Sequence, residues 1–240
     1  LDSFLPSNPW FWNKTSKWPK KYRNSLAGGS FCSCPKYPFT LYRILEMNAG
    51  VILAAGEGTR MGFPKQLAEH KGKTLLQNVY ELVDNYFDKV IIVLGHEADL
   101  ILSLTDLRSA EVLVNENWRE GIGSSLRTSL MYLDNFKEVE NLFLFLGDQP
   151  EVNKKVVERL ISSSDGTREV IVPQYRYRVG YPICIPKNYW DKLSLTSNAE
   201  IEEKQETLDP LSYIKVLDIP TKKIWFQYLN PSDINQEEDR

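Results

Sequence analysis

The stretch that decides the fold is Leu53-Ala54-Ala55-Gly56-Glu57-Gly58-Thr59-Arg60-Met61-Gly62-Phe63-Pro64-Lys65, which follows directly on the apolar residues 49–52. A short apolar run that ends in glycines is typical of a buried strand in a parallel sheet. Glycines let the backbone approach an anion and turn successive N–H groups toward it. Arg60 and Lys65 place positive charge nearby. The stretch therefore predicts a strand followed by a loop that binds phosphate groups.

Two common phosphate-binding loops do not fit this stretch. A Walker loop requires glycine five positions before the Gly-Lys-Thr triplet, but Leu67 holds that position relative to Gly72-Lys73-Thr74. The dinucleotide-binding pattern requires a third glycine where Met61 stands. The loop therefore matches neither pattern, and a glycine-rich turn with two solvated cations is the alternative to a phosphate-binding loop.

The rest of the chain alternates between strand and helix patterns. We predict a fold of class α/β, a Rossmann-like three-layer α/β/α domain with a mostly parallel sheet, because such alternation implies helices on both faces of the sheet. The predicted strands are residues 49–54, 89–94, 111–114, 142–146 and 169–173, with later strands at 182–186 and 224–229. The predicted helices are residues 74–86, 125–133 and 154–162 and one that ends at Leu104. Residues 194–210 are polar, and we predict a surface insertion there.

Polar residues and glycines follow the ends of four predicted strands. The loop from Gly56 follows the first strand, Gly95-His96 the second, Asn115–Ser125 the third, and Asp148 the fourth. In open α/β sheets, ligands bind at the carboxyl ends of the strands. The four strand ends therefore predict one binding site at a single edge of the sheet.

Composition narrows the class of protein further. The formal net charge is −3 and the pI about 5.6, which argues against binding to a nucleic-acid backbone. The sequence has no apolar run of about 18 residues that would span a membrane. Three cysteines without a regular framework fit a reducing compartment, so we expect a cytoplasmic protein. Two histidines are too few for a histidine-rich metal site.

The first 46 residues differ from the rest of the chain. They contain seven Lys/Arg against two Asp/Glu, five of the 13 prolines and three of the six tryptophans. We expect residues 1–46 to be a disordered or loosely packed extension, or an artefact of a start site assigned too early, since the first methionine is Met47. A basic arm for targeting or partner binding is the alternative. Residues 47–240 form the predicted domain.

Several motifs together resemble those of a known family. The pattern Leu53-Ala54-Ala55-Gly56-x-Gly58-x-Arg60-Met61-Gly62-x-Pro64-Lys65 looks like the signature of MobA-like nucleotidyltransferases. The resemblance continues in Asn115-x-x-Trp118-x-x-Gly121-x-x-Ser124-Ser125, in Leu146-Gly147-Asp148-Gln149-Pro150 and in Gly180-Tyr181-Pro182. The Leu-Ala-Ala-Gly opening is most similar to the molybdenum cofactor cytidylyltransferase branch, because the guanylyltransferases have Leu-Ala-Gly-Gly.

The resemblance implies an activity and a set of site residues. The enzyme would move a nucleoside monophosphate, CMP from CTP, onto a phosphate-bearing acceptor such as molybdopterin, release pyrophosphate and use Mg²⁺. A molybdoenzyme would be a partner. The implied catalytic residues are Arg60, Lys65 and Asp148, with Asp148 as the metal ligand. The implied nucleotide-binding residues are Leu53, Ala54, Ala55, Gly56, Glu57, Gly58, Gly95, Gly121 and Ser125. The implied acceptor-binding residues are Arg178, Gly180, Tyr181 and Pro182.

Alternatives stay open for single residues and for the function. Asp148 could cap a turn, Ser125 could be a helix N-cap, and Trp118 could serve packing. Where the family often has Asp-Ile-Asp-Thr-Pro, residues 227–231 read Gln-Tyr-Leu-Asn-Pro, so a second metal-binding carboxylate is missing at Leu229 or Asn230. The acceptor could instead be a sugar phosphate or an alcohol phosphate. A non-catalytic protein that binds and delivers the cofactor is the remaining alternative.

Overall fold

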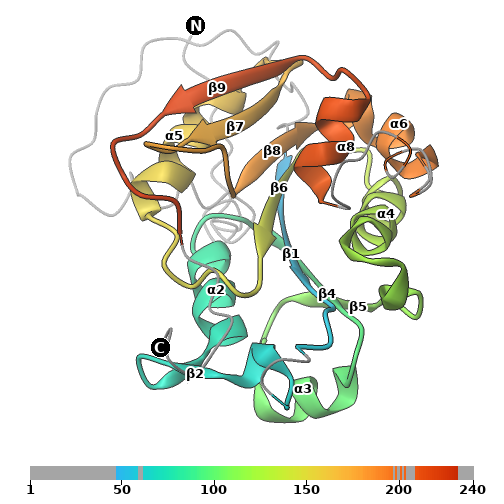
Figure 1. The fold of residues 1–240 in the computed structure, drawn as a ribbon, viewed down its shortest axis with the longest axis vertical. Helices are drawn as coiled ribbons and strands as arrows, with labels where there is room; N and C mark the ends of the chain where they lie inside the picture. Colours follow the sequence, from blue (N-terminus) through green and yellow to red (C-terminus); the bar gives the residue numbers. More distant parts are fainter. Residues whose placement is uncertain are drawn as a thin grey trace, which may run out of the picture. The chain divides into compact units, whose positions relative to one another are not determined.

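The computed structural model describes residues 47–58, 62–196, 198, 201, 203 and 209–231. At its centre lies a seven-stranded sheet in the order β5-β4-β1-β6-β8-β7-β9 (Figure 1). The strands are β1 (Met47–Ala54), β4 (Lys89–Leu94), β5 (Glu111–Val114), β6 (Val139–Leu146), β7 (Val170–Gln174), β8 (Ile183–Pro186) and β9 (Thr221–Trp225). A small hairpin, β2 (Glu69–His70) with β3 (Lys73–Thr74), stands apart from this sheet. The predictions for residues 1–46 lie outside the described residues.

Helices cover both faces of the sheet. The α-helices are α2 (Leu75–Asp84), α3 (Ala98–Leu104), α4 (Ile122–Leu133), α5 (Lys154–Ser164), α6 (Trp190–Leu195) and α8 (Pro210–Val216). Short 3₁₀ turns are η4 (Lys65–Leu67), η5 (Trp118–Glu120) and η6 (Lys187–Tyr189). Side chains of α2, α3 and α5 pack in one core cluster with Ile52 of β1. Those of α4, α6 and α8 pack in a second cluster with Val51 and Leu53. The predicted three-layer α/β/α fold is confirmed.

The sheet is parallel except at β8. Strand β1 pairs in parallel with β4 and with β6. Strand β5 pairs in parallel with β4, and β9 pairs in parallel with β7. Strand β8 runs antiparallel to β6 and to β7. All the strands of this sheet but β8 therefore end at the same edge. Among the described residues, no helix combines the length and the apolar character needed to cross a membrane.

Three expectations need correction. Helix α4 begins at Ile122, three residues before the predicted start, because Gly121 with φ 96° ends the preceding loop. The last strand is Thr221–Trp225 rather than 224–229, since it is an edge strand that carries exposed lysines and so lacks an apolar run. Within the predicted surface insertion, Ile201 is fully buried in the α4 cluster.

Helix α8 packs against the first turn of α4. A Cβ atom added at Gly123 would lie 2.1 Å from the hydroxyl oxygen of Tyr213 in α8. That hydroxyl donates to the side chain of Asn198, whose amide donates to the carbonyl of Glu120 at 2.6 Å. The carboxyl-terminal part of the chain thus holds the beginning of α4 in place.

Candidate active site

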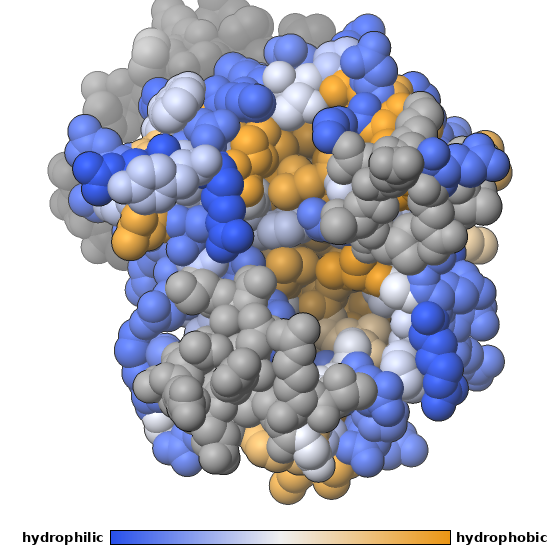
Figure 2. Space-filling model, viewed as in Figure 1, coloured by the Kyte–Doolittle hydropathy of each residue, from blue (hydrophilic) through white to orange (hydrophobic). Residues whose placement is uncertain are grey.

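A pocket of about 420 Å³ lies where β1 and β6 end and α4 begins. Figure 2 shows a hollow in the middle of the viewed face, with hydrophobic residues on its floor. The pocket is lined by Leu53, Ala54, Ala55, Gly56, Gly58, Lys65, Gln66, Trp118, Gly121, Ile122, Ser125, Leu146, Gly147 and Asp148. It therefore lies at the carboxyl edge of the sheet, as the strand ends predict.

The loop after β1 folds back tightly on η4. Gly58 has φ +65°, and a Cβ atom there would lie 2.8 Å from the backbone nitrogen of Lys65. Only glycine combines this left-handed conformation with so close an approach. Residues 59–61 lie outside the described residues, and with them the predicted catalytic residue Arg60. The described part of the loop brings five of its six predicted nucleotide-binding residues, Leu53–Gly56 and Gly58, to the pocket. Glu57 is exposed and does not line it.

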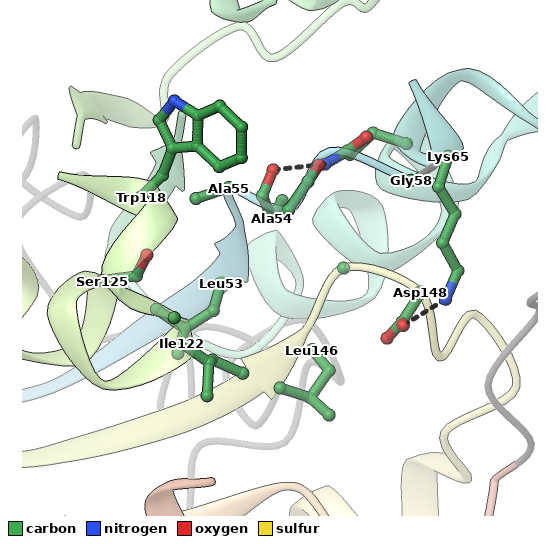
Figure 3. Close-up of a pocket in the computed structure, with 14 residues that line it drawn as sticks. Leu53, Ala54, Ala55, Gly58, Lys65, Trp118, Ile122, Ser125, Leu146 and Asp148 are labelled. Atoms are coloured by element: carbon green, nitrogen blue, oxygen red, sulfur yellow. Dashed lines mark hydrogen bonds and ion pairs between the residues drawn. The ribbon is translucent and has the colours of Figure 1, made fainter. Parts of the chain in front are cut away.

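Lys65 and Asp148 form an ion pair at one end of the pocket. The Lys65 Nζ atom donates to Asp148 Oδ2 at 2.6 Å, and the two side chains are 16% and 29% exposed. Figure 3 shows them pointing toward each other from the loop after β1 and the loop after β6. The second carboxylate oxygen, Oδ1, is buried without a hydrogen-bond partner in the described part of the chain. The carboxylate therefore faces the Lys65 ammonium group instead of capping a turn.

The donor set at Asp148 fits a divalent cation that a ligand helps to hold. A buried carboxylate oxygen without a partner is the kind of ligand that Mg²⁺ prefers. Within the described ranges, no cluster of three or more His, Cys, Asp or Glu side chains could hold a metal ion. Water and phosphate oxygens are the further ligands that Mg²⁺ usually takes.

Ser125 lies at the other end of the pocket, in the first turn of α4. Its hydroxyl oxygen accepts from the Asn115 amide at 3.0 Å, and the residue is only 2% exposed. The same amide donates to Ser124 Oγ at 2.8 Å. The N-cap alternative for Ser125 is wrong, because Gly121 is the N-cap of α4. Figure 3 shows Ser125 and Trp118 across the pocket from the Lys65–Asp148 pair.

Gly95 supports the pocket from outside it. A Cβ atom at Gly95 would lie 2.6 Å from Trp118 Cβ and 2.7 Å from the carbonyl oxygen of Ala55. Gly95 does not line the pocket, but its lack of a side chain lets Trp118 and Ala55 meet. Trp118 also contacts the ring of His96, with centroids 5.1 Å apart. Trp118 thus has both a packing role and a place in the pocket wall.

The predicted acceptor residues lie one strand away. They fall in the connection from β7 to β8, and none of them lines the pocket. Gly180, Tyr181 and Pro182 are buried, and the Tyr181 hydroxyl donates to Asp209. Arg178 is exposed. Because Ile183 pairs with Leu144 in antiparallel register, the start of β8 lies beside the end of β6, the strand that Asp148 follows.

Five lining residues were not predicted as site residues: Gln66, Trp118, Ile122, Leu146 and Gly147. Leu146 and Gly147 precede Asp148 directly, so their position at the strand end was a usable signal. Ile122 follows from the earlier start of α4. Gln66 carried no signal of its own beyond being next to Lys65.

The layered fold and its pocket define an α/β protein with a cavity at the carboxyl ends of its parallel strands. Its family follows from a comparison with family models, since residues 50–208 match the MobA-like NTP transferase domain. The chain belongs to this family.

Individual relatives are similar over part of their length. Nicotine blue oxidoreductase of Paenarthrobacter nicotinovorans is 34% identical over 117 residues, which is 48% of this chain and 55% of that protein. A probable molybdenum cofactor guanylyltransferase of Natranaerobius thermophilus is 29% identical over 129 residues, 52% of this chain and 59% of that protein. The chain thus spans little more than half the length of these two curated relatives.

A solved structure is similar over nearly its whole length. Rv0371c of Mycobacterium tuberculosis H37Rv has a TM-score of 0.69 at 25% identity, covering 81% of this chain and 95% of that chain. The same protein has also been solved in complex with manganese, with a TM-score of 0.64.

Proposed function

We propose that this protein transfers a nucleoside monophosphate, CMP from CTP, onto a phosphate-bearing acceptor such as molybdopterin and releases pyrophosphate. The observation that carries the proposal is the Lys65–Asp148 pair, held 2.6 Å apart at one end of a pocket that the glycine-rich loop lines. The membership in the MobA-like NTP transferase family supports it.

The reaction needs little from the protein besides charge and position. A phosphate monoester of the acceptor attacks the α-phosphorus, and pyrophosphate leaves. The attacking phosphate is already ionised near neutral pH, since its second pKa is about 6. A general base is therefore not required. Positioning and neutralisation of the phosphate charges supply the catalysis.

In this proposal the phosphates of the nucleotide lie at one end of the pocket and its base at the other. Lys65 and the N–H groups of the loop from Ala55 to Gly58 would hold the phosphates, joined by Arg60. Asp148 would hold Mg²⁺, which when bound neutralises charge on the phosphate oxygens. The base would lie at the opposite end, near Ser125 and Trp118. Ala55 is 7% exposed and lines the pocket between them. Its methyl group would crowd a purine base more than the smaller cytosine.

The acceptor would enter from the side of β8. Arg178 is exposed there, and Arg176 is an exposed cation in the same turn. Both could pair with a phosphate group of the acceptor. This arrangement suits molybdopterin and equally a sugar phosphate or an alcohol phosphate. A molybdoenzyme that receives the product is part of the proposal.

The test is a screen for pyrophosphate release with each nucleoside triphosphate against molybdopterin, sugar 1-phosphates and alcohol phosphates. We expect release with CTP and molybdopterin in the presence of Mg²⁺, and none from the Asp148→Asn variant. Binding of nucleotide without release against any acceptor would instead support the non-catalytic delivery protein. Failure to bind any nucleotide would contradict the transferase, and failure to bind molybdopterin as well would contradict the delivery protein.

A further inference from the structure

Gln66 connects the glycine-rich loop to the turn that carries Lys65. The residue is 6% exposed and lies in η4. Its side-chain nitrogen donates to the carbonyl oxygen of Ala54 at 2.6 Å and to that of Gly56 at 2.9 Å. Its side-chain oxygen, Oε1, is buried and has no hydrogen-bond partner in the part of the chain that the structure describes.

The two carbonyl groups lie at the end of β1, one on its last paired residue, Ala54, and one beyond the register, on Gly56. The register of β1 ends at Leu53 on the side of β6 and at Ala54 on the side of β4. A backbone carbonyl that leaves a ladder needs another donor. The single amide group of Gln66 supplies both. Because both of its hydrogens are used, the amide cannot turn over to present Oε1 instead.

Holding these carbonyls also orients two N–H groups of the loop. A peptide unit is planar and trans, so its C=O and its N–H point in opposite directions. A fixed Ala54 carbonyl therefore fixes the N–H of Ala55, and a fixed Gly56 carbonyl fixes the N–H of Glu57. These donors belong to the loop that the proposed function assigns to the triphosphate. Lys65, the residue directly before Gln66, is anchored by the same contact.

We propose that Gln66 is a positioning residue for the triphosphate, one that aligns the loop N–H groups and the Lys65 ammonium group with the phosphates. The inference rests on the proposed function, because it requires a bound nucleoside triphosphate. The unpaired Oε1 supports it. A buried acceptor without a partner is destabilising, which is not expected of a side chain that serves stability alone.

The test compares nucleotides with and without the outer phosphates. In the full chain, Gln66→Met keeps the length of the side chain and removes its donors. We expect calorimetry with Mg²⁺ to show at least about tenfold weaker binding of CTP, equivalent to about 1.4 kcal/mol, and nearly unchanged binding of CMP. Gln77→Met is the matched control, since the Gln77 amide donates to Glu81 on α2 at 3.2 Å and does not line the pocket. It should bind both nucleotides as the wild type does.

A second variant keeps the test decisive if Gln66→Met folds poorly. Gln66→Glu sets a carboxylate against two carbonyl oxygens at pH 8, whereas the protonated acid near pH 5 can donate to one of them. We expect its CTP affinity, relative to wild type, to recover at the lower pH. Equal losses for CTP and CMP in both variants, or unchanged CTP binding, would overturn the inference alone. A wild-type chain that binds neither CTP nor GTP would overturn the proposed function with it.

Discussion

Replacing Lys65 by methionine should destabilise the free protein and make its stability depend on Mg²⁺. In the wild type, the Lys65 ammonium group neutralises Asp148 at 2.6 Å. A cation that binds Asp148 must compete with this ammonium group. The variant leaves the carboxylate without its partner and frees it for the metal. Lysine and metal should therefore act as alternatives at the same carboxylate.

The expected magnitude follows from the burial of the pair. Exposed pairs contribute about 0–1 kcal/mol, and breaking fully buried pairs costs about 3–5 kcal/mol. With side chains 16% and 29% exposed, this pair lies between the two, at roughly 1.5–3 kcal/mol. For a domain of this size each kcal/mol shifts the melting temperature by about 2–4 °C, so the variant should melt about 3–12 °C lower. A cation present at about ten times its Kd would stabilise the folded variant by about 1.4 kcal/mol.

Thermal melts with and without millimolar Mg²⁺ measure both effects. We expect Mg²⁺ alone to stabilise Lys65→Met clearly and the wild type hardly at all, whereas Mg²⁺ with CTP stabilises the wild type. Lys71→Met is the matched control, because Lys71 pairs with Glu151 at 2.8 Å but is 70% exposed. It should melt near the wild-type temperature and show no response to the metal. If Mg²⁺ alone stabilises the wild type as much as Lys65→Met, then Lys65 does not hold the site and the reasoning is wrong.

Three further predictions concern the tail, the base and acid stability. Deleting residues 1–46 should leave the melting temperature and nucleotide affinity nearly unchanged, since β1 starts at Met47, and a loss of several degrees would show that the tail packs on the domain. CTP should bind more tightly than GTP, and Ala55→Gly should narrow the difference measured by calorimetry; tighter GTP binding by the wild type would refute this. Burial raises the pKa of Glu111, but hydrogen bonds from Lys89 and Tyr132 outweigh it and leave the pKa below its usual value. The stability from Glu111 is therefore present above about pH 4.3 and is lost as the pH falls through the lowered pKa, so melts of Glu111→Gln should depend less on pH in that range.

The strand pattern predicted most of the fold because buried parallel strands are short apolar runs. Residues 89–94 and 111–114 form strands with the predicted bounds. The insertion of β8 between β6 and β7 could not be predicted, since the order of strands in a sheet depends on contacts between distant segments. The start of α4 was missed because the conformation of Gly121, not a side-chain cap, defines it.

The site was predictable where a residue type has a direct chemical reason to be there. Asp148 carries a charge just after a strand end and Lys65 carries one after the glycine-rich loop, and the structure brings them together. Gly95 was assigned to the nucleotide, but its contacts with Trp118 and Ala55 give it a packing role behind the pocket. Gln66 was missed because a side chain that bonds to backbone carbonyls leaves no periodic pattern in the sequence.

The contact between α8 and the first turn of α4 bears on how the protein can be shortened. The match to the family ends at residue 208, which suggests a natural point for truncation. A fragment that ended there would lack Tyr213, whose ring covers Gly123 and whose hydroxyl is tied through Asn198 to Glu120. The part of the pocket wall formed by Gly121 and Ser125 would lose the contacts that hold the start of α4 in place. The smallest fragment useful for crystallisation or labelling therefore has to extend beyond Val216.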